Sequence, residues 1–179
     1  MEKQILHRKK ICLLGEFGVG KTSLVRRFVY NKFEEKYLST IGVHICHKTI
    51  IIPAKEPAAA GHQLNLILWD LAHIDKFNAM IKNYFRGANG AIVVFDLTRL
   101  QNAQHTNAFL DPFLQMNPNA QLIIAGNKVD LVQDQSASLE QLLHICKTYN
   151  APCKLTSAKT GENVEPLFSE LASQLLKVG

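Results

Sequence analysis

The chain has 179 residues, of which 47% are hydrophobic and 20% charged, a composition typical of a folded globular protein. Its net charge of +5 is mild, and the sequence contains no continuous basic stripe and no aromatic platform, which argues against nucleic acid as a partner. No apolar run approaches the roughly 20 residues that cross a bilayer. We therefore expect residues 1–179 to form a single domain.

The termini and the cysteines give information on the cellular location of the protein. The N-terminus lacks the apolar core of a secretory signal, and no lipidation motif is visible at either end, so the sequence offers no direct membrane anchor. The four cysteines form no CxxC pair and lie among apolar residues, as buried reduced thiols do. We expect a cytoplasmic protein, and recruitment to a membrane through a partner stays open.

Apolar runs of strand length alternate along the chain with segments whose apolar residues recur at helical spacing. The runs expected to form strands are "KICLLG", "VHICHKTIII", "LNLILWD", "GAIVVFDLT", "AQLIIAGNKVD" and "APCKLTSAKTG". The expected helices lie near residues 21–33, 102–116, 138–149 and 163–177, and a further helix ends at Gly87. Continuous apolar strands joined by helices indicate an α/β protein with a mostly parallel sheet covered on both faces. Ligands of such sheets bind beyond the carboxyl ends of the strands.

The strongest local signal is "GEFGVGKTS", which satisfies G-x-x-x-x-G-K-[ST] between an expected strand and an expected helix. Glycines let such a loop curl so that its N–H groups and the following helix N-terminus face phosphate oxygens. Lys21 would reach the β- and γ-phosphates, and the Thr22 hydroxyl would ligate Mg²⁺. The alternative is a glycine-rich turn that only connects strand and helix. The residues expected around the phosphates are Phe17, Gly18, Val19, Gly20, Lys21, Thr22 and Ser23.

Two later segments, "NKVD" and "TSAKTG", follow apolar strands and indicate which base is bound. The Asp130 carboxylate would accept two hydrogen bonds from the N1 and N2 edge of guanine, which adenine cannot supply. Asn127 would either bind the base edge or brace the loop, and the Lys128 stem would cover the ring. A backbone N–H near Ala158 would donate to the guanine carbonyl. The remaining residues expected at the nucleotide here are Leu131, Ser157 and Lys159.

With "YLSTIGV", "LILWD" and "YFRGANGAIVVFDLT" added, these motifs make the chain resemble the small GTPases of the Ras superfamily over nearly its whole length. The resemblance is closest to the Rab branch and its bacterial Rab-like relatives. It implies the three-layer P-loop NTPase fold, with a six-stranded, mostly parallel sheet and about five helices. It also implies GTP and GDP as ligands and Mg²⁺ as cofactor. An effector protein would bind two switch segments near residues 33–46 and 71–86, and an exchange factor or a GTPase-activating protein would regulate them.

Four more site residues follow from the resemblance. Thr40 would ligate Mg²⁺ and sense the γ-phosphate, and Asp70 would hold Mg²⁺ through a water. Phe33 matches the aromatic residue that packs against guanine, and Tyr37 matches the tyrosine that closes over the phosphates. Two of them also have a structural explanation, because Phe33 could be a core residue that closes the first helix and Asp70 could cap a turn at a strand end.

The chain departs from the family pattern at the residues that serve hydrolysis. The family has D-x-x-G followed by glutamine, whereas this chain has His73 in place of the glycine and Ile74 in place of the glutamine. Ile74 has no group that can orient the attacking water, and His73 adds a side chain where a glycine N–H would approach the γ-phosphate. His73 is either a substitute donor or base, or a solvated side chain. Phe17 stands where the family residue is usually small, so it either crowds the water or turns outward.

Three functions compete on this sequence. The first is a Rab-like guanine-nucleotide switch with very weak intrinsic hydrolysis. The second is a pseudo-GTPase scaffold that is locked in one nucleotide state or indifferent to the nucleotide, since a loop with His73 cannot report the γ-phosphate in the usual way. The third is an ATP-dependent kinase of small metabolites, which shares the phosphate-binding loop but needs a cluster of arginines that the sequence does not show.

Overall fold

The computed structural model describes residues 5–34, 42–52, 62–71, 83–100, 106–133 and 136–177, and every structural statement below concerns these residues. Their strands form one six-stranded sheet in the order β2-β3-β1-β4-β5-β6. The strands are β1 (Ile5–Leu14), β2 (Val43–Ile52), β3 (His62–Leu71), β4 (Gly90–Asp96), β5 (Gln121–Asn127) and β6 (Cys153–Thr156). The β2–β3 pair is antiparallel, and the other neighbours run parallel.

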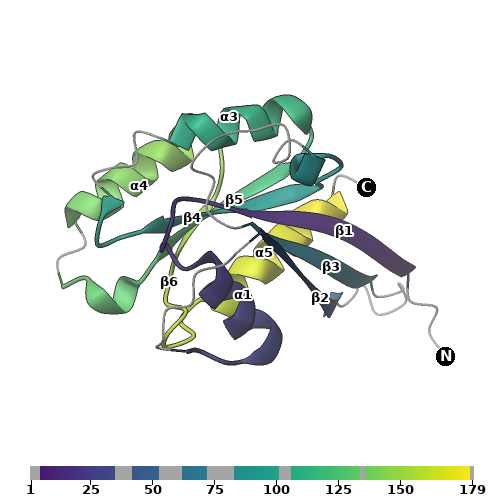
Figure 1. The fold of residues 1–179 in the computed structure, drawn as a ribbon, viewed down its shortest axis with the longest axis horizontal. Helices are drawn as coiled ribbons and strands as arrows, with labels where there is room; N and C mark the ends of the chain where they lie inside the picture. Colours follow the sequence, from purple (N-terminus) through teal and green to yellow (C-terminus); the bar gives the residue numbers. More distant parts are fainter. Residues whose placement is uncertain are drawn as a thin grey trace.

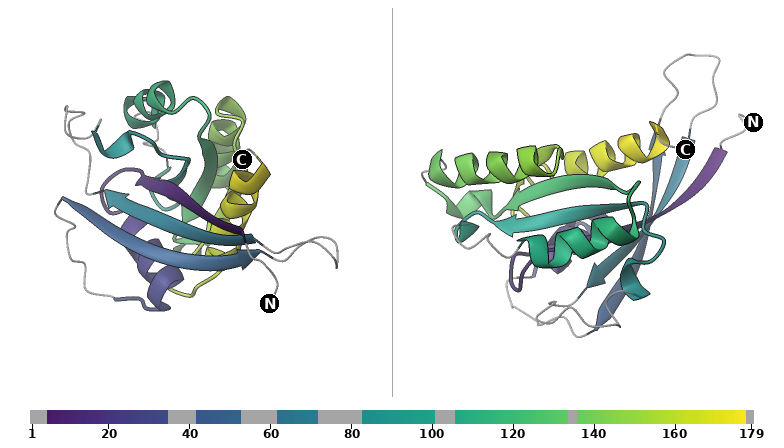
Figure 2. Two further views of the ribbon diagram at one scale, coloured as in Figure 1. Left: turned by 90° about the vertical axis from the view of Figure 1, so that its right-hand side faces the viewer. Right: turned by 90° about the horizontal axis from the view of Figure 1, so that it is seen from above.

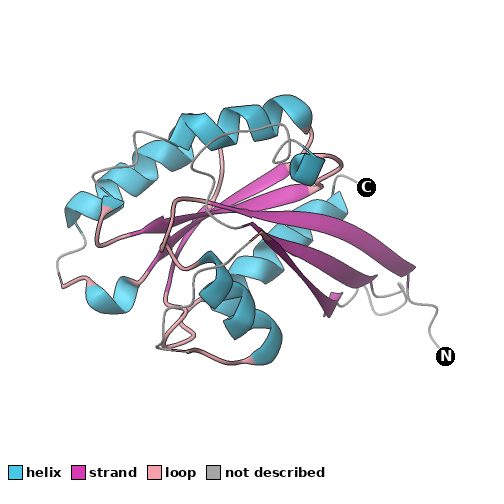
Figure 3. Ribbon diagram, in the orientation of Figure 1, coloured by secondary structure: helices cyan, strands magenta, loops and turns pink. Residues whose placement is uncertain are grey.

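Helices cover both faces of this sheet. They are α1 (Lys21–Tyr30), α3 (Thr106–Met116), α4 (Ser136–Thr148) and α5 (Val164–Lys177), with the short 3-10 helix η2 (Val129–Leu131) after β5. Helices α1 and α5 pack on one face, and α3 and α4 pack on the other (Figure 1), as the two further views confirm (Figure 2). The strands therefore form the middle of three layers (Figure 3), which confirms the expected fold class. None of the helices described is long and apolar enough to cross a membrane.

The strand residues alternate between two apolar cores. In β1, Ile11 and Leu13 face the core under α1 and α5, whereas Cys12 and Leu14 face the core under α3 and α4. A strand that is buried on both faces needs apolar residues at every position, which is why β4 is continuously apolar up to its last residue, Asp96. The same pattern made the central strands recognisable in the sequence.

Several element boundaries differ from expectation, and two of the differences have a clear physical cause. Strand β1 begins at Ile5 rather than at residue 10, because residues 5–9 pair with the long β3 strand although three of the five are polar. Helix α1 ends at Tyr30 rather than at residue 33, because Asn31 adopts a left-handed conformation (φ 52°) and its N–H caps the last carbonyls of the helix. The helical turn before β4 ends at Gly87 as expected, with φ 72°.

The strand register brings polar residues together at the carboxyl edge of the sheet. Asp96 at the end of β4 is level with Asn127 at the end of β5, and Asn127 is level with Thr156 at the end of β6. Asp70 near the end of β3 is level with Leu13, two residues before the loop that follows β1. Because parallel strands end at one edge, segments that lie far apart in the sequence form a single site there.

The stacked pair Phe28–Phe168 joins α1 to α5, with ring centroids 3.9 Å apart. Replacement of Phe168, which is 1% exposed, by alanine leaves a cavity between the two helices. We expect Phe168→Ala to lower the free energy of unfolding by about 3–5 kcal/mol in urea denaturation. Ser173→Ala on the exposed side of the same helix is the matched control and should change it little. A small effect of Phe168→Ala would contradict the packing described.

Candidate functional site

The loop between β1 and α1 has a backbone that only glycines accommodate at two positions. Gly15 has φ 140°, and a Cβ there would lie 2.3 Å from the Val94 carbonyl oxygen. Gly20 has φ 100°, and a Cβ there would lie 2.3 Å from the Asn127 side-chain nitrogen. The glycines of the motif therefore permit both the curl of the loop and its close approach to β4 and β5.

Side chains from two parts of the chain bind carbonyl groups of this loop. Lys21 Nζ donates to the Gly15 and Glu16 carbonyl oxygens at 2.8 and 2.9 Å. Asn127 Nδ2 donates to the Val19 carbonyl oxygen at 2.9 Å. These bonds hold three carbonyl groups of the loop, an arrangement typical of loops whose N–H groups face an anion.

Lys21 lies at the base of the loop with only 8% of its surface exposed. Burial lowers the pKa of its ammonium to about 8, against the attraction of Asp70 and Glu16, which raises it. A cation that burial disfavours binds an added anion more strongly than a solvated cation does. The position and the lowered pKa suit a phosphate group at the mouth of the loop.

Thr22 and Asp70 form a second polar pair beside Lys21. The Thr22 hydroxyl donates to Asp70 Oδ2 at 2.6 Å. Asp70 is fully buried, and no donor among the described residues reaches its other oxygen, Oδ1. Burial raises the pKa of this carboxyl, although the bond from Thr22 and the charge of Lys21 oppose the rise. A buried carboxylate oxygen without a partner beside a hydroxyl is a fitting donor set for Mg²⁺, directly or through water.

The segments after β5 and β6 interlock through Asn127 and Asp130. Asn127 Oδ1 accepts from the Thr156 hydroxyl at 3.3 Å and from the Ala158 N–H at 3.2 Å. Asp130 Oδ1 accepts from the Ser157 hydroxyl at 2.6 Å, which fixes the carboxylate of an otherwise exposed residue. Of the two roles considered for Asn127, bracing the loops is the one observed. The Ala158 N–H is engaged with Asn127, so it can serve a base carbonyl only if this bond is shared or released.

Lys128 connects the same region to β4. It has a left-handed backbone (φ 67°), and its Nζ contacts Asp96 Oδ2 at 2.5 Å. Thr98 donates to the other Asp96 oxygen through its N–H at 3.0 Å and its hydroxyl at 2.6 Å. Burial opposes ionisation of Asp96, but the bonds from Lys128 and Thr98 outweigh it and lower the pKa of the carboxyl. Asp96 is therefore a buried anion that orients the Lys128 stem.

Three contributing residues had not been singled out in the sequence. Asp96 carried a signal, because it ends an apolar strand as Asp70 does. Arg27 of α1 donates from Nε to the Ala158 carbonyl at 2.9 Å, and Arg99 donates from Nη2 to the Phe17 carbonyl at 3.1 Å. Both arginines bind backbone carbonyls that lie far away along the chain, which the local sequence does not indicate, although Arg99 also contacts Asp96, three residues before it.

The remaining expected site residues fall into two groups. Phe33 is partly buried against the core under α1. Phe17 is 46% exposed, and Leu131, in η2, is 60% exposed. Ser23 lies in the first turn of α1, and Lys159 is exposed in the segment after β6. The other expected residues lie outside the described part of the chain: Tyr37, Thr40, His73 and Ile74.

Known proteins match this chain over nearly its whole length. The profile of the family described as "Ras family" matches residues 10–177. Among characterised proteins, Ras-related protein SEC4 of Candida albicans (strain WO-1) is 33% identical over 165 residues. That alignment covers 92% of this chain and 75% of the yeast protein. The family match includes the loop after β1 and the ends of the later strands.

The two buried carboxylates should respond to pH with opposite sign. The pKa of Asp70 is raised, so its charge costs stability at neutral pH, and the cost disappears as pH falls toward the ordinary value of 3.8. The pKa of Asp96 is lowered, so its charge adds stability that is lost as pH falls through and below 3.8. In protein stripped of nucleotide and metal, Asp70→Asn should raise the free energy of unfolding at neutral pH, and Asp96→Asn should lower it.

Urea denaturation at neutral and acidic pH measures the free energy of unfolding of each variant relative to the parent. Both differences should become smaller as the pH is lowered. The two variants control for each other, since both replace a buried carboxylate by an amide at a strand end. A loss of stability in Asp70→Asn equal to that in Asp96→Asn would contradict the description of Asp70 as a carboxylate that lacks a partner.

Proposed function

Because the chain belongs to the Ras family and is a Rab-like small GTPase, we propose that it is a guanine-nucleotide switch that binds GTP or GDP with Mg²⁺. The observation that carries this proposal is the side-chain bridge made by Asn127, which joins the loop after β1 to the segments after β5 and β6. A phosphate-binding loop and a base-binding loop fixed to one another suit a nucleotide that spans both.

The roles of the individual residues follow from their positions. Lys21 would bind the phosphates, and the loop N–H groups would surround them. Thr22 and Asp70 would hold Mg²⁺, which would neutralise phosphate charge when bound. The Asp130 carboxylate, oriented by Ser157, would accept the N1 and N2 protons of guanine, while the Lys128 stem and Leu131 would flank the ring.

We expect slow hydrolysis. Isoleucine at position 74 can neither donate to nor accept from a water, and the imidazole at position 73 occupies the place of a glycine. Because phosphoryl transfer depends on positioning and electrostatic stabilisation, loss of the group that orients water removes much of the catalysis while leaving nucleotide binding intact. The exposed side chain of Phe17 favours the outward orientation over crowding of the water.

The switch would act on proteins. We expect an effector to contact the segments near residues 33–46 and 71–86, with an exchange factor or GTPase-activating protein as regulators and with membrane recruitment through a partner. The second candidate function is a scaffold that does not distinguish GTP from GDP. His73 is the observation that favours it, because this residue stands where the family senses the γ-phosphate.

Calorimetry tests the nucleotide-binding part of the proposal. In Mg²⁺, GDP and a non-hydrolysable GTP analogue should bind the stripped protein, and ATP should not. Asp130→Asn should weaken GDP binding by about 100-fold or more, because the variant places an amide donor against guanine donors. The control Asp111→Asn, on α3, should leave it unchanged. Equal affinity for GDP and the GTP analogue would favour the scaffold, and preference for ATP would overturn the proposal.

Single-turnover hydrolysis of GTP tests the catalytic part. The double variant His73→Gly/Ile74→Gln restores the family residues and should raise the rate roughly tenfold or more, since one oriented donor is worth about that much or more in a transition state. Ile74→Leu lacks a hydrogen-bonding group and should leave the rate unchanged. A parent chain that hydrolyses GTP as fast as the double variant would refute impaired hydrolysis without affecting the evidence for binding.

A further inference from the structure

One contact on the phosphate-binding loop comes from outside the family motifs. Arg99, in the turn after β4, donates from Nη2 to the Phe17 carbonyl oxygen at 3.1 Å. The same guanidinium donates from Nε to Asp96 Oδ2 at 3.2 Å. It thus bridges the loop after β1 and the buried carboxylate that also binds Lys128.

The direction of the Phe17 carbonyl determines the direction of the next amide. A trans peptide is planar, and its C=O and N–H groups point to opposite sides. The Gly15 and Glu16 carbonyls turn toward Lys21, at the base of the loop, whereas the Phe17 carbonyl turns toward Arg99 on the β4 side. The Gly18 N–H therefore points away from Arg99. Gly18 itself has φ 72°, a conformation that glycine adopts at little cost, and the contact from Arg99 helps to hold the peptide that precedes it.

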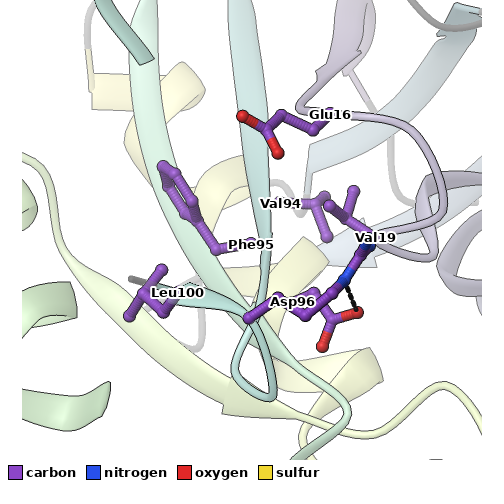
Figure 4. A pocket seen from close by; sticks show the side chains of 7 residues that line it. Glu16, Val19, Val94, Phe95, Asp96 and Leu100 are labelled. Atoms are coloured by element: carbon purple, nitrogen blue, oxygen red, sulfur yellow. Dashed lines mark hydrogen bonds and ion pairs between the residues drawn. The ribbon is translucent and has the colours of Figure 1, made fainter. Parts of the chain in front are cut away.

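Arg99 is itself held in place by its contact with Asp96. Asp96 is 4% exposed and is fixed by Thr98 and Lys128, so the guanidinium is anchored at Nε while Nη2 reaches the loop. A pocket separates the loop from the end of β4 on this side, where Glu16 and Val19 face Phe95, Asp96 and Leu100 (Figure 4). Arg99 lines the same pocket. A planar fork with several donors suits such a double contact, whereas a lysine ammonium offers a single point.

We propose that Arg99 is a positioning residue that holds the Phe17–Gly18 peptide with its amide toward the phosphates and thereby slows nucleotide release. This inference rests on the proposed function, since it assigns a regulator of release to the same site. Arg99 also connects the two halves of the site through Asp96. This carboxylate accepts from Arg99 on the phosphate side and from Lys128 on the base side. Loss of Arg99 would let the peptide rotate and would weaken the hold on the phosphates.

The release of a fluorescent GDP analogue from Mg²⁺-loaded protein, chased with excess GDP, tests the role of Arg99. Arg99→Ala should accelerate release roughly threefold to tenfold, the range for loss of a charge-assisted but partly exposed hydrogen bond. Arg99→Lys should restore release only in part, because an ammonium cannot contact Asp96 and Phe17 in the same geometry. Arg8→Ala, which removes an exposed arginine from the far end of β1, is the charge-matched control and should match the parent.

A second readout separates positioning from general loosening of the site. IDP lacks only the amino group that Asp130 would recognise, so the ratio of IDP to GDP release rates should be the same in Arg99→Ala as in the parent. The Arg99 side chain is 54% exposed, so its removal should leave the melting temperature of the protein unchanged.

The outcomes distinguish the two proposals. Unchanged release in Arg99→Ala, full restoration by Arg99→Lys, or an altered ratio of IDP to GDP release would overturn the role of Arg99 while leaving guanine-nucleotide binding in place. A parent chain that binds no guanine nucleotide would overturn the proposed function, and the role of Arg99 with it.

Discussion

The site depends on the orientation of the peptide groups between Gly15 and Gly20. A loop can present several N–H groups to an anion only if its carbonyl groups turn elsewhere and find donors there. In this chain the donors are Lys21 for Gly15 and Glu16, Arg99 for Phe17, and Asn127 for Val19. Asn127 comes from the end of β5 and Arg99 from the turn after β4, so the loop acquires its shape only when the sheet is assembled. The geometry of the site therefore depends on the complete fold.

The buried carboxylates at the sheet edge have different functions because their surroundings differ. Asp96 has donors on both oxygens and a lowered pKa, so it is a structural anion that orients Lys128 and Arg99. Asp70 has one donor, Thr22, and a raised pKa, so it retains an oxygen for a cation. Residue type and strand position are alike in the two cases. The number of donors around each carboxylate therefore distinguishes Asp70, which suits a cation, from Asp96, which braces the site.

Much of this arrangement could be predicted from the sequence, and the exceptions have a physical reason. The central strands were recognisable because burial on both faces requires unbroken apolar runs, and the loop from Gly15 to Thr22 because its geometry restricts residue choice. The beginning of β1 was missed because residues 5–9 are held by pairing with β3 rather than by apolar burial. Arg27 and Arg99 could not be predicted as site residues, because they bind backbone carbonyls of distant loops and every residue type has a backbone carbonyl. Asn127 was assigned two roles, and only the contacts distinguished them.

We propose that these loops bind a guanine nucleotide and that the protein turns it over slowly. The most direct measurement is to denature the freshly purified protein and identify the nucleotide released by chromatography. We expect a stoichiometric guanine nucleotide with a substantial share of GTP, since the binding residues are intact and the group that orients water is absent. Release of GDP alone would contradict slow turnover, and release of an adenine nucleotide or of none would contradict the assignment of the site.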